Sequence, residues 1–190
     1  GWRFYPRWLQ ALENSFGPIM SRLRADDLPN CIEDLKKGEV DFVIAYQSDF
    51  ALSMARFPSL ESLKIGRDKL IPVCKRLPGG SPLFNIDDGA RAAIPYLRFG
   101  ETAPIGNHVD PLLKSSGIEA KLQVVYENSM AGALRVRARE GAGIAWLPRS
   151  LVQPDLEAKM LTLAGGNSWS INLEIRLHRL NLDQNLLTHK

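Results

Sequence analysis

Two polar loops contain the residue types best suited to hold a small anion. Arg98 and Thr102 lie in RFGETAPIGN (residues 98–107), between an apolar strand-like run and a helical pattern. The segment ENSM (residues 127–130) has the same position before the next helical pattern. A guanidinium forms paired hydrogen bonds to carboxylates and oxyanions, and unpaired N–H groups at a helix start attract the same groups. The spacing therefore predicts an anion or carbonyl site, although N-capping alone would explain Ser129.

Two sulfur-containing side chains could add redox chemistry. Met130 adjoins the second loop, and oxidation of its thioether would place a polar sulfoxide there, although packing is the commoner role of a methionine. Cys74 ends the predicted strand KLIPVC, where a buried thiol is usually inert. The only other cysteine, Cys31, lies in a different predicted unit. Two such cysteines indicate no disulfide framework and are typical of a cytoplasmic protein.

No catalytic or metal-binding constellation is recognisable. His108 and Asp110 could act together as a general base or as two ligands of a metal ion. However, no third metal ligand has suitable spacing. The serines lack the Gly-x-Ser-x-Gly context of a nucleophile elbow. The Gly-x-Gly of residues 141–143 precedes a predicted strand instead of following one, so it is no dinucleotide fingerprint. We therefore predict that the chain is not an enzyme and binds neither a metal ion nor a cofactor.

Alternating helices and strands must position these residues. Helical spacing of apolar residues, each followed by a glycine, predicts helices at 5–16, 28–37, 107–116 and 131–140. Strand patterns cover 19–23, 40–46, 60–65, 69–74, 96–99, 122–126, 143–147, 156–163 and 171–178, with further short helices at 87–93 and 181–190. Ligands of open α/β sheets bind at the carboxyl ends of strands, so the loops after three of these strands should face one cleft.

The stretch GAGIAWLPRSLV (residues 141–152) is the most specific in the chain. It closely resembles the G-x-G-I-A-x-L-P-x-x-x-V segment of the effector-binding domain of LysR-type transcriptional regulators. EDLKKGEVDFVIAY (residues 33–46) and KLIPVC (residues 69–74) resemble further segments of that domain. LIPVC, SPLFN, ENSM and GAGIAWLP together resemble its hypochlorite-responsive subgroup most.

The resemblance implies an α/β fold of two Rossmann-like lobes joined by a two-strand hinge, like a type 2 periplasmic binding protein. Residues 1–70 and 149–190 would form the first lobe, and residues 71–148 the second. The winged helix-turn-helix DNA-binding domain of full-length members is absent from the chain. The chain begins abruptly with the apolar segment GWRFYPRWLQ, which is typical of a fragment that lacks an upstream strand.

The resemblance also implies a function, which is to sense a small anionic ligand or an oxidant at the cleft between the lobes. It implies an antiparallel homodimer of this domain, a tetramer of the full-length protein, contact with DNA only through the missing domain, and no membrane contact. The alternatives are a free solute-binding protein of the same fold and a small α/β enzyme. The expected ligand-binding residues are Tyr46, Gln47, Arg98, Phe99, Gly100, Thr102, Asn128, Ser129, Met130 and Trp146, with Met130 and Cys74 as redox candidates.

The composition is that of an ordinary globular domain. Of the 190 residues, 45% are hydrophobic and 24% are charged, and no apolar run approaches the roughly 18 residues of a transmembrane helix. The formal net charge is only +3 and the basic residues are scattered along the chain. We therefore expect this chain to bind no DNA specifically by itself.

Overall fold

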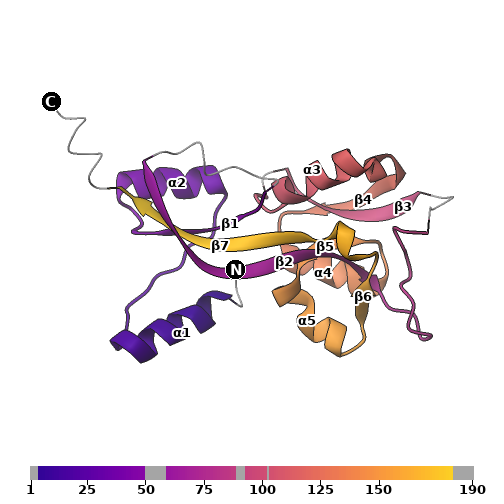
Figure 1. Cartoon of the computed structure of the whole chain (residues 1–190), viewed down its shortest axis with the longest axis horizontal. Helices are drawn as coiled ribbons and strands as arrows, with labels where there is room; N and C mark the ends of the chain where they lie inside the picture. Colours follow the sequence, from indigo (N-terminus) through magenta and orange to yellow (C-terminus); the bar gives the residue numbers. More distant parts are fainter. Residues whose placement is uncertain (1–3, 50–58, 89–92, 102, 182–190) are drawn as a thin grey trace.

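The computed structural model describes residues 4–49, 59–88, 93–101 and 103–181. Within these residues, a curled five-stranded antiparallel sheet and a two-stranded parallel sheet are surrounded by helices (Figure 1). The helices are α1 (Phe4–Phe16), α2 (Leu28–Lys37), α3 (Gly106–Ser116), α4 (Ala131–Glu140) and α5 (Arg149–Glu157), with 3-10 turns η1 (Ile118–Lys121) and η2 (Asn167–Trp169). The strands are β1 (Val43–Gln47), β2 (Leu60–Lys75), β3 (Ile94–Phe99), β4 (Leu122–Asn128), β5 (Ala145–Pro148), β6 (Leu161–Leu163) and β7 (Ile171–Leu180).

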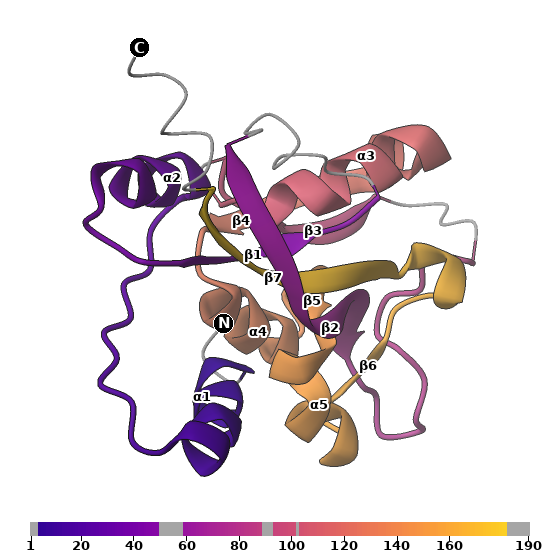
Figure 2. The same ribbon diagram turned by 60° about the vertical axis from the view of Figure 1, so that its left-hand side comes forward.

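Two long strands connect the ends of the molecule. β2 and β7 pair antiparallel from Leu60 opposite Leu180 to Leu70 opposite Ile171. Beyond Leu70, β2 pairs with β5 and β6 instead, while β1 adds to the other side of β7. As a result, α1, α2 and β1 lie at one end, and β3 to β6 with α3 to α5 lie at the other (Figures 1 and 2).

The small parallel sheet is joined to the large one just before β5. The N–H of Ile144 donates to Pro95 O at 2.8 Å, and the N–H of Leu97 donates to Ile144 O at 2.8 Å. A Cβ atom added to Gly143 would lie 2.6 Å from Pro95 O, which is too close for any side chain. Gly143 therefore lets two backbones approach closely enough to connect the sheets.

Two clusters of buried side chains form the core. In one, the ring of Trp146 meets Tyr96 edge-on, with 5.7 Å between ring centroids. In the other, Leu134 of α4 packs with Val152 of α5 and Leu161 of β6. α5 and β6 therefore pack against α4, a helix of the predicted second lobe.

α2 shows how the sequence begins and ends a helix. Asp27 Oδ1 accepts the backbone N–H of Asn30 at 2.9 Å, which satisfies one of the unpaired donors of the first turn. Gly38 ends the helix with a left-handed φ of 73°. Ile32 and Leu35 form the buried face of the helix between these ends.

Most of the predicted elements are confirmed. The four helices with glycine stops correspond to α1, α2, α3 and α4, and the strands at 40–46, 96–99, 122–126, 143–147 and 171–178 correspond to β1, β3, β4, β5 and β7 within a few residues. The fold class is also confirmed as a mixed α/β fold with a curled sheet. The helix predicted at 181–190 and most of the one predicted at 87–93 lie outside the described residues.

One strand prediction is wrong, and three others differ from the structure in extent. Residues 19–23 form no strand, and Met20 is fully exposed, because no described strand lies beside this segment to pair with it. The strands predicted at 60–65 and 69–74 are one strand, β2, whose register shift between Lys64 and Gly66 breaks the apolar alternation. The strand predicted at 156–163 is reduced to β6, because α5 extends to Glu157 with Pro154 inside it.

We predict that Gly143→Ala destabilises the fold by about 2 kcal/mol or more, because the new methyl group overpacks against Pro95. Gly132→Ala is the matched control, since a Cβ atom at Gly132 meets nothing within 4 Å. In the first turn of α4 this change should raise stability by several tenths of a kcal/mol. Urea unfolding midpoints of the two variants and the wild type measure both effects. Equal midpoints for the two variants would contradict the close approach.

Candidate functional site

The two loops that the sequence singled out lie in contact. β3 and β4 are parallel neighbours, with Phe99 opposite Asn128. The N–H of Gly100 donates to Asn128 O at 3.2 Å, and a Cβ atom on Gly100 would lie 2.8 Å from Ser129 Oγ. α3 and α4 begin shortly after these strand ends, as the site prediction requires.

A buried hydrogen bond joins the loop after β1 to the same place. Ser48 Oγ lies 2.7 Å from His108 Nδ1 in the first turn of α3, and these residues are only 6% and 2% exposed. The sequence analysis considered His108 only together with Asp110 and did not associate it with Ser48. The one available signal was that His108 shares the apolar helical spacing of Val109 and Leu113, which α3 also buries.

Arg98 is the partly exposed cation of this region. Its Nη2 lies 3.7 Å from Asp110 Oδ2 of α3, beyond hydrogen-bond distance, and the two side chains are each about one-third exposed at 34% and 35%. Among the described residues its ion-pair partner is this distant carboxylate, so the guanidinium keeps donors that a carboxylate or oxyanion can accept.

Tyr46 is attached to the crossing strands through Asp68. The Tyr46 hydroxyl donates to Asp68 Oδ2 at 3.4 Å, and the same carboxylate accepts the N–H and hydroxyl of Ser150 at 3.2 and 2.5 Å and the N–H of Lys69 at 2.8 Å. Burial, and then the charge of Asp68, raise the pKa of Tyr46 well above its usual value. The phenol is therefore a neutral donor whose proton is directed towards Asp68. Gln47, the next residue, ends β1 and is partly buried.

Several of the predicted ligand-binding residues are buried in this conformation. Phe99 and Gly100 are buried at the end of β3. Trp146 is 1% exposed and its Nε1–H donates to Trp169 O at 2.8 Å, so its side chain belongs to the core. Thr102 lies outside the described residues.

The two redox candidates differ in accessibility. Cys74 is fully buried, its Sγ contacts Phe84 O at 3.3 Å, and burial raises the pKa of its thiol, so the nucleophilic thiolate is disfavoured. Met130 is 68% exposed.

The N-cap of α4 is Met130 and not Ser129, because Asn128 Oδ1 accepts the N–H of Met130 at 2.8 Å and delays the helix by one residue. The N-cap prediction for Ser129 was therefore wrong.

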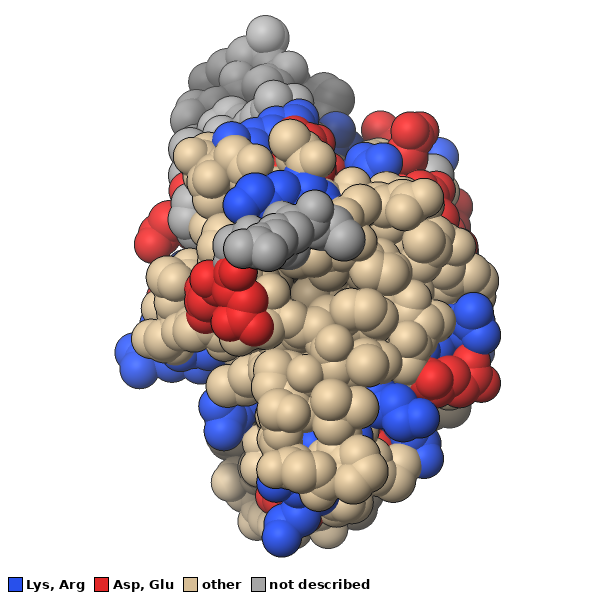
Figure 3. Space-filling view, turned by 90° about the vertical axis from the view of Figure 1, so that its right-hand side faces the viewer, with Lys and Arg blue, Asp and Glu red and all other residues tan. Residues whose placement is uncertain are grey.

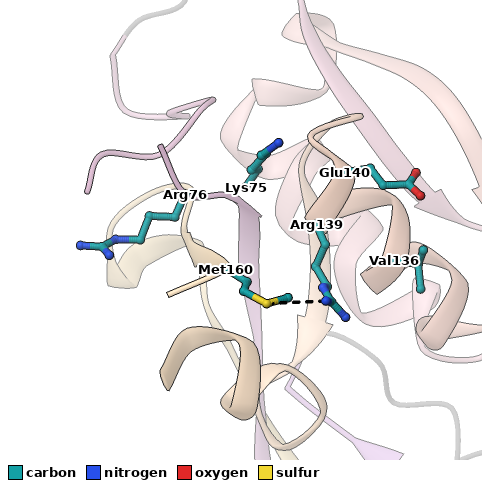
Figure 4. Close-up of a pocket in the computed structure, with 6 residues that line it drawn as sticks. All are labelled: Lys75, Arg76, Val136, Arg139, Glu140 and Met160. Carbon is teal, nitrogen blue, oxygen red and sulfur yellow. Dashed lines mark hydrogen bonds between the residues drawn. The ribbon is translucent and has the colours of Figure 1, made fainter. Parts of the chain in front are cut away.

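A cavity of about 460 Å³ lies towards the other end of α4. Figure 4 shows that its cationic groups point in different directions, with the Arg76 guanidinium directed away from the other side chains. Arg139 Nη2 approaches Met160 Sδ at 3.6 Å. Because the cations do not converge, this cavity is a weaker anion site than the three joined loops. Its lining residues are Lys75, Arg76, Val136, Arg139, Glu140 and Met160.

Other classes of site find little support in the part of the chain that the structure describes. No group of three His, Cys, Asp or Glu side chains there could hold a metal ion, and no helix there is long and apolar enough to cross a membrane. Ser48 and His108 resemble two members of a hydrolytic triad, but both are buried and no carboxylate forms an ion pair with His108 among these residues. On the face shown in Figure 3, charges of both signs are scattered around an uncharged centre, with no single basic patch.

A mixed α/β fold with a curled antiparallel sheet, and with loops from separate strands gathered at one place, is typical of the periplasmic-binding-protein-like binding domains. The LysR substrate binding domain model matches residues 1–180, and the chain belongs to this family.

Two curated relatives are similar to the chain over 163 residues, which is 86% of its length. They are the HTH-type transcriptional regulator YjiE of Escherichia coli K12, at 23% identity, and the HTH domain-truncated transcriptional regulator QseD of Escherichia coli O157:H7, at 22%. The chain spans 51% and 64% of their lengths. Both relatives carry the name of transcriptional regulators.

Solved structures share the fold. The apo regulatory domain of HypT from Salmonella typhimurium has a TM-score of 0.76 at 19% identity, over 94% of this chain and 83% of that one. DarR of Vibrio fischeri, in complex with DNA, has a TM-score of 0.78 at 24% identity, over 95% of this chain and 58% of that one.

We predict that stability falls as the pH drops from about 6.5 towards 4. Burial lowers the pKa of His108 and of His178 from 6.5 to about 4, so in this range the unfolded chain binds protons that the folded chain does not. Each histidine would cost roughly 3 kcal/mol over that range. His178→Leu should leave stability at pH 7 little changed, because the buried Nε2 of His178 has no hydrogen-bond partner among the described residues, and should reduce the pH slope. Urea unfolding at several pH values measures the slope, and identical slopes for variant and wild type would contradict the prediction.

Proposed function

We propose that the chain is the effector-sensing regulatory domain of a LysR-type DNA-binding transcriptional regulator. The observation that carries this proposal is the meeting of three strand-end loops, through the Ser48–His108 hydrogen bond and the Gly100–Asn128 contact. Loops from separate strands that meet at one point can all contact the same ligand, so that one ligand can affect all of them. Membership of the LysR substrate binding domain family supports the same function.

The effector class that the site favours is a small anion. Arg98 supplies a partly exposed guanidinium, and α3 and α4 both direct their N-termini towards the adjoining strand ends. A bromide-bound form of the HypT regulatory domain is among the structures with this fold. A halide, an oxyanion or a carboxylate would suit the same donors.

An oxidant is the second effector class, and Met130 is its candidate target. The thioether of Met130 is exposed beside Asn128, whose side chain holds the start of α4. A sulfoxide oxygen there would compete for the same backbone donors. The buried thiol of Cys74 is a poorer target for an oxidant.

In the full-length protein, the domain would act by shifting the arrangement of its lobes and of its antiparallel dimer, and so of DNA-binding domains outside this chain. We place that protein in the cytoplasm, as a dimer of this domain within a tetramer. The rival function is that of a free solute-binding protein of the same fold. The gene sequence upstream of Gly1 distinguishes the two, since a helix-turn-helix supports regulation and a secretory signal supports the rival.

We predict that Arg98→Ala weakens anion binding by at least about 10-fold, because hydrogen bonds to a charged group contribute about 1.5–3 kcal/mol. Calorimetric titration with bromide, sulfate and acetate measures the affinity. Arg179→Ala is the matched control, because Arg179 is exposed on β7 and paired with Glu61. If both variants bind these anions like the wild type, the anion site lies elsewhere.

We predict that Met130 is oxidised by low doses of hypochlorite while Cys74 is not, because their exposed fractions are 68% and 0%. Peptide mass spectrometry after graded treatment measures both modifications. Met130→Leu should abolish any oxidant-induced change in the anion affinity of the domain. A response that persists in this variant would exclude Met130 as the sensor.

A further inference from the structure

Ser48 and His108 come from opposite ends of the molecule. Ser48 follows β1, an edge strand of the large sheet that pairs only with β7 among the described strands. His108 lies in α3, which follows a strand of the small parallel sheet. Their hydrogen bond of 2.7 Å, between residues 60 positions apart, therefore holds two separately supported elements together.

The surroundings of this pair are closed to solvent. Tyr46 and Ile105, on the two sides of the junction, both pack against the buried cluster that contains Val109. Both members of the pair are more than nine-tenths buried. The structure thus shows the junction in a shut form, with Ser48 and His108 in contact and excluded from solvent.

We propose that the Ser48–His108 hydrogen bond is a latch that holds β1 against α3 and sets the balance between the shut and open forms of the cleft. The inference rests on the proposed function, because the cleft is the predicted effector site. In the shut form Ser48 and His108 are both buried, and each provides the hydrogen-bond partner of the other. Removing one partner leaves the other buried and unpaired, which penalises the shut form only.

The energetics predict an unusual pattern of mutational effects. A buried polar group left without its partner is unfavourable, so Ser48→Ala should favour the open form by about 5-fold or more. His108→Leu alone should act in the same direction through the orphaned hydroxyl of Ser48. The double variant leaves no polar group unpaired, so it should return towards the wild-type balance. A purely additive packing defect would instead make the double variant the most open of the three.

The distance between α2 and α3 reports the two forms, because these helices belong to opposite ends of the molecule (Figure 1). Nitroxide labels on Glu33→Cys and Lys114→Cys, read by pulsed electron resonance, measure this distance in the 190-residue chain. Cys31→Ser removes the other accessible thiol, and Cys74 is fully buried. We expect one short distance for the wild type, an added longer one for each single variant, and recovery in the double variant.

Ser115→Ala is the matched control, since the Ser115 hydroxyl donates to Leu112 O on the exposed face of α3 and should leave the distances unchanged. Wild-type distances in a folded Ser48→Ala chain would overturn the latch, as would additive opening in the double variant. If Ser48→Ala does not fold, the comparison of His108→Leu with the double variant gives the same decision. No effector or promoter is used, so failure of the latch leaves the anion titrations of Arg98→Ala to decide the proposed function separately.

Discussion

The pairing of β2 with β7 is the constraint on which the rest of the structure depends. Their ladder runs from Leu60 to Leu70 on one strand and back from Ile171 to Leu180 on the other. β2 then continues into the far half and supplies the edge for β5 and β6. Since β2 and β7 belong to both ends of the molecule, relative motion of the ends must bend or twist these two strands.

Polar contacts connect the neighbouring elements to one another. Partly buried Asp68 connects β2 to Tyr46 of β1 and to Ser150 at the start of α5. Asp155, which is buried, accepts two hydrogen bonds from Arg135 and so joins α5 to α4 within one end of the molecule. Because a buried polar contact is costly to leave unmade, the Arg135–Asp155 pair favours movement of α4 and α5 as one unit.

Local features of the fold were predictable from the sequence, and long-range ones were not. The helices ended by Gly38, Gly117 and Gly141 follow from the left-handed conformation that glycine adopts without strain. α5, which contains Pro154, was not predicted, and its first residues are stabilised by the side chain of Asp68, more than 80 positions away in the sequence.

The candidate site shows the same division. The adjacency of the loops after β3 and β4 follows from the rule for parallel strands, and the structure brings Gly100 and Ser129 together. The contact between Ser48 and His108 depends on how β1 sits against α3, and no local pattern encodes that position. Trp146 was expected to line the cleft because of the family resemblance, yet its indole N–H is bonded to Trp169 O within the core.

The accessibility of the sulfur atoms limits how an oxidant signal could reach the cleft. Met20 is fully exposed on a segment without regular structure, so its oxidation would alter no packed contact. Cys74 is fully buried, so an oxidant reaches its thiol only if the surrounding core opens first. Met130 combines exposure with a position at the start of α4, where Asn128 fixes its N–H and its carbonyl accepts the first helical hydrogen bonds. A change at Met130 would therefore act through the backbone at a helix start, next to the strand ends that β3 and β4 bring together.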